Sequence, residues 1–161
     1  MELKFRVAAR IDKPVHDVFE AVADPDQISR YFTTGGAKGR LETGATVTWD
    51  FHDYPGAFPV NVIEVVPDER IVLEWDAAEG EAPNVDDRNH IANAGYKTTV
   101  TMTFKALEDG RTMVEIAEEG WRENQGALDA SYGNCQGWTG MLLALKVWVE
   151  HGINLRDGLY K

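Results

Sequence analysis

Every second residue is apolar at the start of the chain: Leu3, Phe5, Val7, Ala9 and Ile11. A period of two is typical of a strand with one buried face and one face in water. The first element is therefore predicted to be a strand.

Two short helices are predicted directly after this strand. Asp12 can cap the first helix, and Pro14 suits its first turn because no hydrogen-bond donor is needed there. Asp24-Pro25 ends that helix, and Asp24 can cap a second helix that carries residues 28–32.

The middle of the chain has the pattern of short strands separated by turns. The predicted strands cover residues 47–51, 58–66, 70–75, 96–107 and 111–119. Glu108-Asp109-Gly110 joins the last two as a hairpin. Residues 76–95 are polar and have no clean period, so we expect an insertion or a loop there. Six or seven strands in a meander indicate an antiparallel sheet.

The last third of the chain has the period of a helix. Apolar side chains recur at intervals of three and four residues: Trp138, Met141, Leu142, Leu145, Trp148 and Val149. They predict an amphipathic helix that ends at Gly152 and at its longest covers residues 125–151. Gly133 and Gly137 lie inside it, although each lowers helix propensity by roughly 1 kcal/mol. One sheet face and one helix stripe must cover each other, which predicts a single α+β domain over residues 1–161.

Composition and charge narrow the classes of protein. The net charge of −11 disfavours nucleic acids and anionic membrane surfaces as partners, and no apolar run reaches the ~20 residues of a membrane span. A single cysteine, Cys135, excludes an intrachain disulfide framework and a thiolate metal cluster. The first residues lack the apolar stretch of a secretory signal, so we expect a cytoplasmic protein.

Four stretches together resemble one known family. They are residues 11–21 (IDKPVHDVFEA), 63–75 (IEVVPDERIVLEW), 98–104 (TTVTMTF) with Gly120-Trp121, and 137–146 (GWTGMLLALK) closing at 150–152. Their order is similar to that of the START-like, or SRPBCC, helix-grip superfamily, and within it to bacterial homologues of the activator of heat-shock protein 90 ATPase. The resemblance implies a curved antiparallel sheet of six or seven strands with a long carboxy-terminal helix packed across its concave face. It implies no single activity, because this fold hosts unrelated functions.

A pocket is expected between the helix and the sheet, because one helix cannot fill a strongly bent sheet completely. Family members usually have Trp-Phe where this chain has Tyr31-Phe32, and the added hydroxyl should change how that corner binds. Aromatic residues at the rim suit a small apolar molecule, although the same side chains could simply pack together. The ligand-binding candidates are Tyr31, Trp49, Phe51, Val62, Leu73, Trp75, Met102, Phe104, Ile116, Trp121, Trp138, Leu142 and Leu145.

Glu118 is the candidate catalytic residue. A carboxyl group among Trp121, Trp138 and Met102 would have a raised pKa and could act as an acid or a base. The alternative is a solvent-facing carboxylate at a strand end, which is favoured by how rarely glutamate is buried. Three further polar residues could face the pocket: Asp50, His52 and Glu64.

No metal site and no cofactor are expected. Asp50, His52 and Asp53 alternate between the faces of a strand and form no closed ligand set. The same interpretation applies to Asp86, Asp87 and His90. The chain also lacks a phosphate loop, a nucleophile elbow and a dinucleotide fingerprint.

The long helix has a second apolar stripe roughly opposite Trp138: Gly140, Leu143, Ala144 and Val147. A helix that is apolar on two faces is covered on both. Either the insertion at 76–95 or a second copy of the chain could supply the cover. Two-fold pairs are the commonest assembly, which favours a homodimer.

Three functions follow, in order of preference. The first is a small apolar-ligand binding or carrier protein. The second is an enzyme of the cyclase or hydrolase kind that uses Glu118 with His52 or Tyr31. The third is a co-chaperone-like regulator of a heat-shock protein ATPase, which would need an exposed interaction patch.

Overall fold

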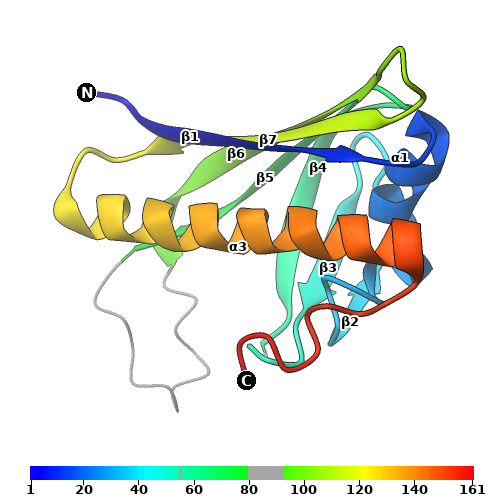
Figure 1. Ribbon diagram of the computed structural model, residues 1–161. Coiled ribbons are helices and arrows are strands. Elements are labelled where there is room, and N and C mark those ends of the chain that lie inside the picture. Colours follow the sequence, from blue (N-terminus) through cyan, green and yellow to red (C-terminus); the bar gives the residue numbers. More distant parts are fainter. Residues whose placement is uncertain (55, 80–92) are drawn as a thin grey trace.

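The computed structural model describes residues 1–54, 56–79 and 93–161. The elements are β1 (Leu3–Ile11), α1 (Val15–Ala23), α2 (Pro25–Ile28), β2 (Gly36–Lys38), β3 (Thr46–Asp50), β4 (Phe58–Val66), β5 (Arg70–Ala78), β6 (Asn93–Ala106), β7 (Thr112–Trp121) and α3 (Gln125–His151). Neighbouring strands are antiparallel, in the order β1-β7-β6-β5-β4-β3-β2. Figure 1 shows α3 lying across one side of the curved sheet, which confirms the helix-grip α+β fold.

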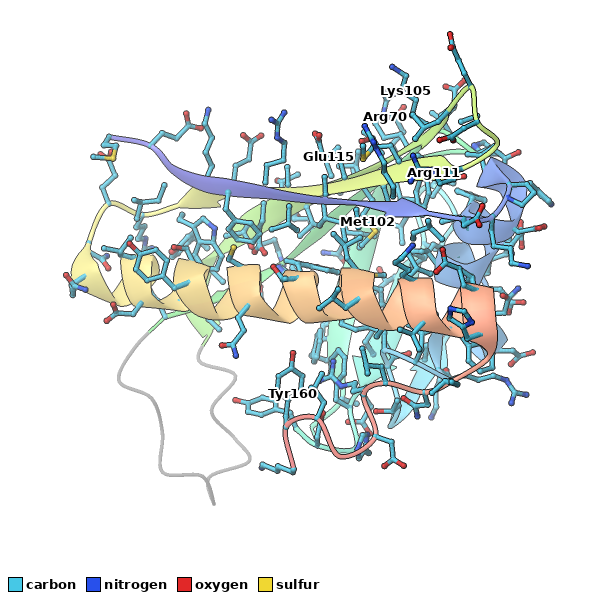
Figure 2. The ribbon with its side chains drawn as sticks, in the orientation of Figure 1. Arg70, Met102, Lys105, Arg111, Glu115 and Tyr160 are labelled. Carbon is cyan, nitrogen blue, oxygen red and sulfur yellow. The ribbon has the colours of Figure 1, made fainter. Side chains whose placement is uncertain are left out.

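The face of the sheet toward α3 is apolar, as strand parity predicts. Met102 of β6 is buried between the sheet and the helix, whereas Arg70, Lys105 and Glu115 extend from the opposite face (Figure 2). Trp75 on the inner face is only partly buried. The buried apolar residues on this face include Val47, Trp49, Phe51, Val60, Val62, Ile71, Leu73, Val100, Met102, Phe104, Val114 and Ile116.

The ends of α3 are fixed by caps. The Asn124 side chain accepts a hydrogen bond from the Ala127 backbone N–H at 2.8 Å, and Gly152 ends the helix in the left-handed conformation with φ 69°. The 27 residues between these caps agree with the longest predicted range. At 1.5 Å per residue the helix is about 40 Å long. Among the described residues, no helix is both long and apolar enough to cross a lipid bilayer.

The predicted cap at Asp12 is wrong. The N-cap residue of α1 is Pro14, and no side chain caps this helix. The Asp12 backbone N–H donates instead to the Glu150 carboxylate of α3 at 2.7 Å. This bond ties the turn after β1 to the end of the long helix, so a tertiary contact replaces the local cap.

The second short helix is shorter than predicted. Its cap is confirmed, since the Asp24 side chain accepts a hydrogen bond from the Asp26 backbone N–H at 2.9 Å. It ends at Ile28, however, so Tyr31 and Phe32 lie in the turns that follow it. These turns carry Phe32 to the functional site described below.

The sheet is also larger than predicted. The sequence pattern does not predict β2, whose three residues are too few to show a period. β5 extends to Ala78 and β6 begins at Asn93, so both ends of the predicted 76–95 insertion belong to the sheet. Residues 80–92 lie outside the described part of the chain.

Candidate functional site

A cavity of about 140 Å³ opens between α3, β5 and the turns that follow α2 and β3. A cavity of roughly 150 Å³ holds one benzene-sized molecule, whereas pockets for drug-sized ligands span about 300–1,000 Å³. The site is therefore limited to a fragment-sized molecule or to one group of a larger one. Its lining residues are Phe32, Phe51, Trp75, Gly133, Asn134, Gly137, Trp138 and Arg156.

Five aromatic side chains form a closed ring of contacts, and four of them line this cavity. The centroid of Phe32 lies 5.0 Å from that of Phe51 and 5.6 Å from that of Trp138. Trp75 stacks on Trp138 at 5.4 Å. Phe58 closes the ring at 5.8 Å from Trp75 and 5.9 Å from Phe51. Such pairs contribute about 0.5–1.5 kcal/mol each beyond burial, so the ring is a stable wall.

Two glycines of α3 leave space on the helix side of the cavity. Gly133 and Gly137 are four residues apart and so lie on one face of the helix. A Cβ atom built at either position would have no heavy atom within 4 Å. The packing therefore does not require glycine at these positions, although each costs the helix about 1 kcal/mol relative to alanine. Their effect is to leave the cavity open.

Glu118 supports the wall of the cavity from inside the protein. Its side chain is fully buried. Oε2 accepts hydrogen bonds from Thr98 Oγ1 at 2.7 Å and Trp75 Nε1 at 3.1 Å. Oε1 accepts one from Trp138 Nε1 at 3.0 Å, and Asn134 Nδ2 lies 3.1 Å from both oxygens. Three of these four donors line the cavity, so the carboxylate orients that wall.

The strand position of Glu118 explains its burial. It follows Val114 and Ile116 on the face of β7 toward α3, and it lies opposite Val100 of β6. The solvent-facing interpretation is therefore wrong. Strand parity predicts the inner face for this residue, although buried glutamate is rare in general.

Two opposing effects act on the acidity of the Glu118 carboxyl group. Burial raises its pKa above the usual range, because desolvation disfavours the charged form, and the hydrogen bonds from Thr98, Trp75, Trp138 and Asn134 offset part of the rise. Within the described residues it forms no ion pair. Four donors fit an ionised carboxylate, which only accepts hydrogen bonds. A substrate would have to displace one of these donors to exchange a proton with it.

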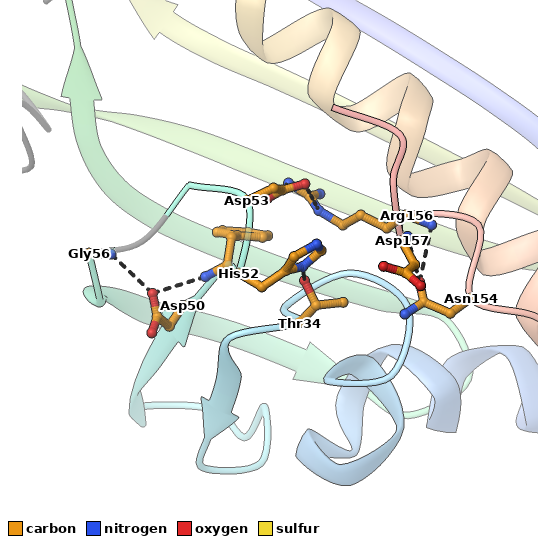
Figure 3. Close-up of polar contacts among 9 residues, drawn as sticks. Thr34, Asp50, His52, Asp53, Gly56, Asn154, Arg156 and Asp157 are labelled. Carbon is orange, nitrogen blue, oxygen red and sulfur yellow. Dashed lines mark hydrogen bonds and ion pairs between the residues drawn. The ribbon is translucent and has the colours of Figure 1, made fainter. Parts of the chain in front are cut away.

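Arg156, in the segment after α3, is the charged residue of the cavity. Its Nε and Nη2 atoms donate to the two oxygens of Asp53 at 2.9 Å each, and both side chains are largely buried. The guanidinium carbon lies 4.5 Å from the centroid of Phe51 and 5.5 Å from that of Phe32. The Asn154 side chain accepts a hydrogen bond from the Arg156 backbone N–H at 3.1 Å and fixes the local turn (Figure 3).

A family model matches residues 12–150 of the chain, and its description is Activator of Hsp90 ATPase homolog 1-like protein. The chain belongs to this family. The match confirms the resemblance that the four sequence stretches indicate. No curated protein sequence matches the chain.

Solved structures with a similar fold agree with this membership. The protein SSP2350 from Staphylococcus saprophyticus is 25% identical, with a TM-score of 0.74 and 96% of each chain covered. MLL2253 from Mesorhizobium loti is 19% identical, with a TM-score of 0.71 over 92% of this chain and 97% of that chain. The Aha1 dimer from Colwellia psychrerythraea is 18% identical, with a TM-score of 0.70 over 93% of this chain and 98% of that chain. The last two show the fold alone.

In this member of the Activator of Hsp90 ATPase homolog 1-like family, three predicted ligand residues line the cavity: Phe51, Trp75 and Trp138. The sequence pattern does not predict the lining by Phe32, Asn134 and Arg156. Trp121 packs in a second cluster with Ala77 and Ala127. The remaining candidates are close-packed in the core, with exposed fractions of 5% or less: Tyr31, Trp49, Val62, Leu73, Met102, Phe104, Ile116, Leu142 and Leu145.

The predicted partners of Glu118 lie elsewhere. The Tyr31 hydroxyl donates to the Ala21 carbonyl at 2.9 Å, and burial raises its pKa well above the usual range. His52 is exposed and contacts the Thr34 hydroxyl (Figure 3). Neither residue is hydrogen-bonded to Glu118 in the structure.

Asp50 and Glu64 also point away from the cavity. The Asp50 carboxylate accepts hydrogen bonds from the backbone N–H groups of Phe51 and Gly56 at 3.0 and 3.1 Å (Figure 3). Glu64 pairs with Arg70 at 2.8 Å at the surface of the sheet. Both carboxylates therefore stabilise local structure.

Within residues 1–54, 56–79 and 93–161, no group of three histidine, cysteine, aspartate or glutamate side chains could hold a metal ion. Asp53 is already paired with Arg156. The predicted interpretation of Asp86, Asp87 and His90 falls outside the described residues.

The second stripe of α3 is partly covered by the end of the chain. Tyr160 points toward α3 (Figure 2), and its hydroxyl occupies the space that a Cβ atom at Gly140 would need. Ala144 is buried and Val147 is half-buried, while Leu143 is 52% exposed. The last residues of the chain are thus a cover that the sequence pattern does not predict.

Proposed function

We propose that the protein binds a small, largely apolar molecule in the cavity between α3 and the sheet and acts as a binding or carrier protein. Aromatic walls with a few placed polar groups are the usual composition of small-molecule sites. The observation that carries the proposal is the pair of helix glycines, Gly133 and Gly137, facing a closed aromatic ring. They keep open a space that ordinary helix residues would occupy.

The size of the cavity limits the ligand. About 140 Å³ suits one aromatic ring or a small branched group. Because the cavity is open to the surface, a larger molecule could place one group inside and leave the rest outside. The polar groups available to orient it are the Asn134 amide and the Arg156–Asp53 pair.

An enzyme that uses Glu118 is the less well supported alternative. A general acid or base must reach its substrate proton, and all four donors around Glu118 are already hydrogen-bonded to it. A regulator of a chaperone ATPase, the activity in the family's name, ranks third. It needs an exposed interaction surface, and the apolar side chains exposed on α3 are better explained by self-association.

We further propose that two copies pair through the outer face of α3 and the end of the chain. Leu143, Ile153, Leu159 and Tyr160 are all more than 40% exposed, with values of 52%, 57%, 45% and 43%. Large exposed apolar patches are typical of protein contacts. The similar Aha1 protein from Colwellia psychrerythraea is a dimer in its solution structure, which agrees with this proposal.

The binding proposal is tested by melting temperature. A library of benzene-sized neutral and charged compounds should contain members that raise the melting temperature of the wild type, since a ligand at 100 times its Kd adds about 2.7 kcal/mol of stability. Gly137→Leu fills the cavity and should abolish the shift. Gln136→Leu adds the same side chain at an exposed neighbouring position and should retain it. A shift that survives Gly137→Leu, or no shift with any compound, would contradict the proposal.

A further inference from the structure

We propose that the aromatic cavity selects an organic cation, such as a trimethylammonium group, and that Arg156 is an intramolecular cation held at its rim. The inference rests on the proposed binding function and names the chemical class of its ligand. Three features of the site carry it: the aromatic ring, the charges around that ring and the position of Arg156.

The walls of the cavity are largely aromatic. The face of an aromatic ring carries negative electrostatic potential and attracts a cation within about 6 Å of its centroid. Phe32, Phe51, Trp75 and Trp138 all line one small space. A tetrahedral ammonium group inside it would contact several rings at once, which is how aromatic cages recognise methylated ammonium groups.

The protein already places one cation against this wall. The Arg156 guanidinium lies over Phe51 at 4.5 Å and over Phe32 at 5.5 Å, and it contacts the Tyr160 ring at 5.2 Å. Its charge is balanced by the bidentate pair with Asp53. The pair is neutral as a whole, so it does not repel a second cation in the cavity through net charge.

Glu118 makes the tryptophan faces more attractive to a cation. Both indole N–H groups, of Trp75 and Trp138, donate to its carboxylate, at 3.1 and 3.0 Å. An N–H group that donates to an anion is polarised toward it, and the ring it belongs to becomes richer in electrons. The buried negative charge also acts directly on the cavity, because few water molecules screen it there.

Asn134 is the remaining polar residue of the lining. Asn134 donates through Nδ2 to both oxygens of Glu118. The amide nitrogen is therefore engaged by Glu118, and the carbonyl oxygen of Asn134 is a hydrogen-bond acceptor. The net charge of −11 adds a long-range attraction for cations. The Glu118 carboxylate and the net charge of the chain therefore both favour positive charge at the site.

The test compares a cation with its neutral isostere. Choline and 3,3-dimethylbutan-1-ol have nearly the same shape and differ in the charge of one central atom. Titration calorimetry on the wild type should show choline binding about 10-fold more tightly, the size expected for a desolvated cation–π site. Equal or tighter binding of the neutral alcohol would overturn the cation selectivity and leave the apolar-ligand proposal intact. If neither compound binds while a neutral aromatic does, the selectivity is likewise overturned.

A double variant tests the role of Arg156. Arg156→Met combined with Asp53→Asn removes both charges together and so leaves no unpaired buried ion. Its choline affinity should rise several-fold, because the intramolecular cation no longer shares the rings, and the ratio of choline to alcohol affinity should rise with it. Thermal unfolding of the double variant checks that it is folded. A folded double variant with a lower choline-to-alcohol ratio would contradict the assignment of Arg156 as a cation at the rim that shares the rings with the ligand.

Discussion

Glu118 combines the cost of a buried carboxylate with four compensating hydrogen bonds. Removing a charge from water is unfavourable unless its surroundings replace the lost solvation. Among the described residues the replacement comes from neutral donors, two of them indole N–H groups. Glu118 therefore holds the side chains of Trp75 and Trp138 in place, and its burial raises its pKa.

Glu118→Gln should lower the unfolding free energy by roughly 1–3 kcal/mol, because the new amide N–H group faces side chains that are themselves donors. Because the pKa of Glu118 is raised, the loss of unfolding free energy in Glu118→Gln should depend on pH. In the wild type the folded state holds the Glu118 proton more tightly than the unfolded state, so stability from this group is present below the usual glutamate pKa and is lost as pH rises through the raised value. Glutamine does not titrate.

The difference in unfolding free energy between wild type and Glu118→Gln should therefore be larger at about pH 4 than at about pH 7. Urea denaturation at a series of pH values measures it. If the difference widens with rising pH instead, the four hydrogen bonds outweigh desolvation. The pKa of Glu118 is then lowered in the folded protein rather than raised.

Residue-level prediction succeeds where a local rule applies and fails where a partner is distant in the chain. The parity of β7 places Glu118 on the inner face, so its burial could have been inferred. Arg156 could not have been assigned, because its partner Asp53 is 103 residues away and only the folded chain brings them together. Phe32 reaches the cavity through turns that carry no periodic signal.

Within the element α3, the glycines that leave the cavity open also lower the helix propensity. Gly137→Ala should raise the unfolding free energy by roughly 0.5–1 kcal/mol, since the added Cβ meets no neighbouring atom and the helix gains propensity. The same change should weaken ligand binding, because it takes up space in the cavity. Chemical denaturation and titration of one variant measure both effects. Lower stability, or unchanged affinity, would contradict this account of the glycine.

At Gly140, on the same helix, an added Cβ atom should disturb a contact instead of stabilising the protein. A Cβ atom there conflicts with the Tyr160 hydroxyl, so Gly140→Ala should displace Tyr160 and speed amide hydrogen exchange in residues 156–161. Adding Tyr160→Phe removes the hydroxyl and should restore slow exchange. If Gly140→Ala leaves the exchange of this segment unchanged, the end of the chain is not held against α3 by this contact.

Periodicity determines which elements could be predicted. The alternation of β1 and the apolar stripe of α3 each extend over nine or more residues and give clear signals. β2 has three residues, and α2 has four, too few for a period to show. The cap on α1 fails as a prediction because the Asp12 N–H bonds to Glu150, a contact that no local rule contains.

At the scale of the whole molecule, the outer face of α3 is the proposed contact between two copies. Leu143→Glu places a charge at the exposed centre of that face and should convert a dimer to a monomer, since a buried unpaired carboxylate costs several kcal/mol. Sedimentation velocity measures the change. Lys105→Glu, on the opposite face of the sheet, is the control and should not alter the mass. A wild type that sediments as a monomer would contradict the pairing.

We propose that a small molecule binds within the aromatic ring supported by Glu118. The most direct measurement is a titration with phenol followed through the five tryptophan indole N–H signals in a nitrogen-15 NMR spectrum. The signals of Trp75 and Trp138 should shift to saturation, while that of Trp148, at the far end of α3, stays in place. If all five signals remain unchanged, or if the Trp148 signal shifts and those of Trp75 and Trp138 do not, the cavity is not the binding site.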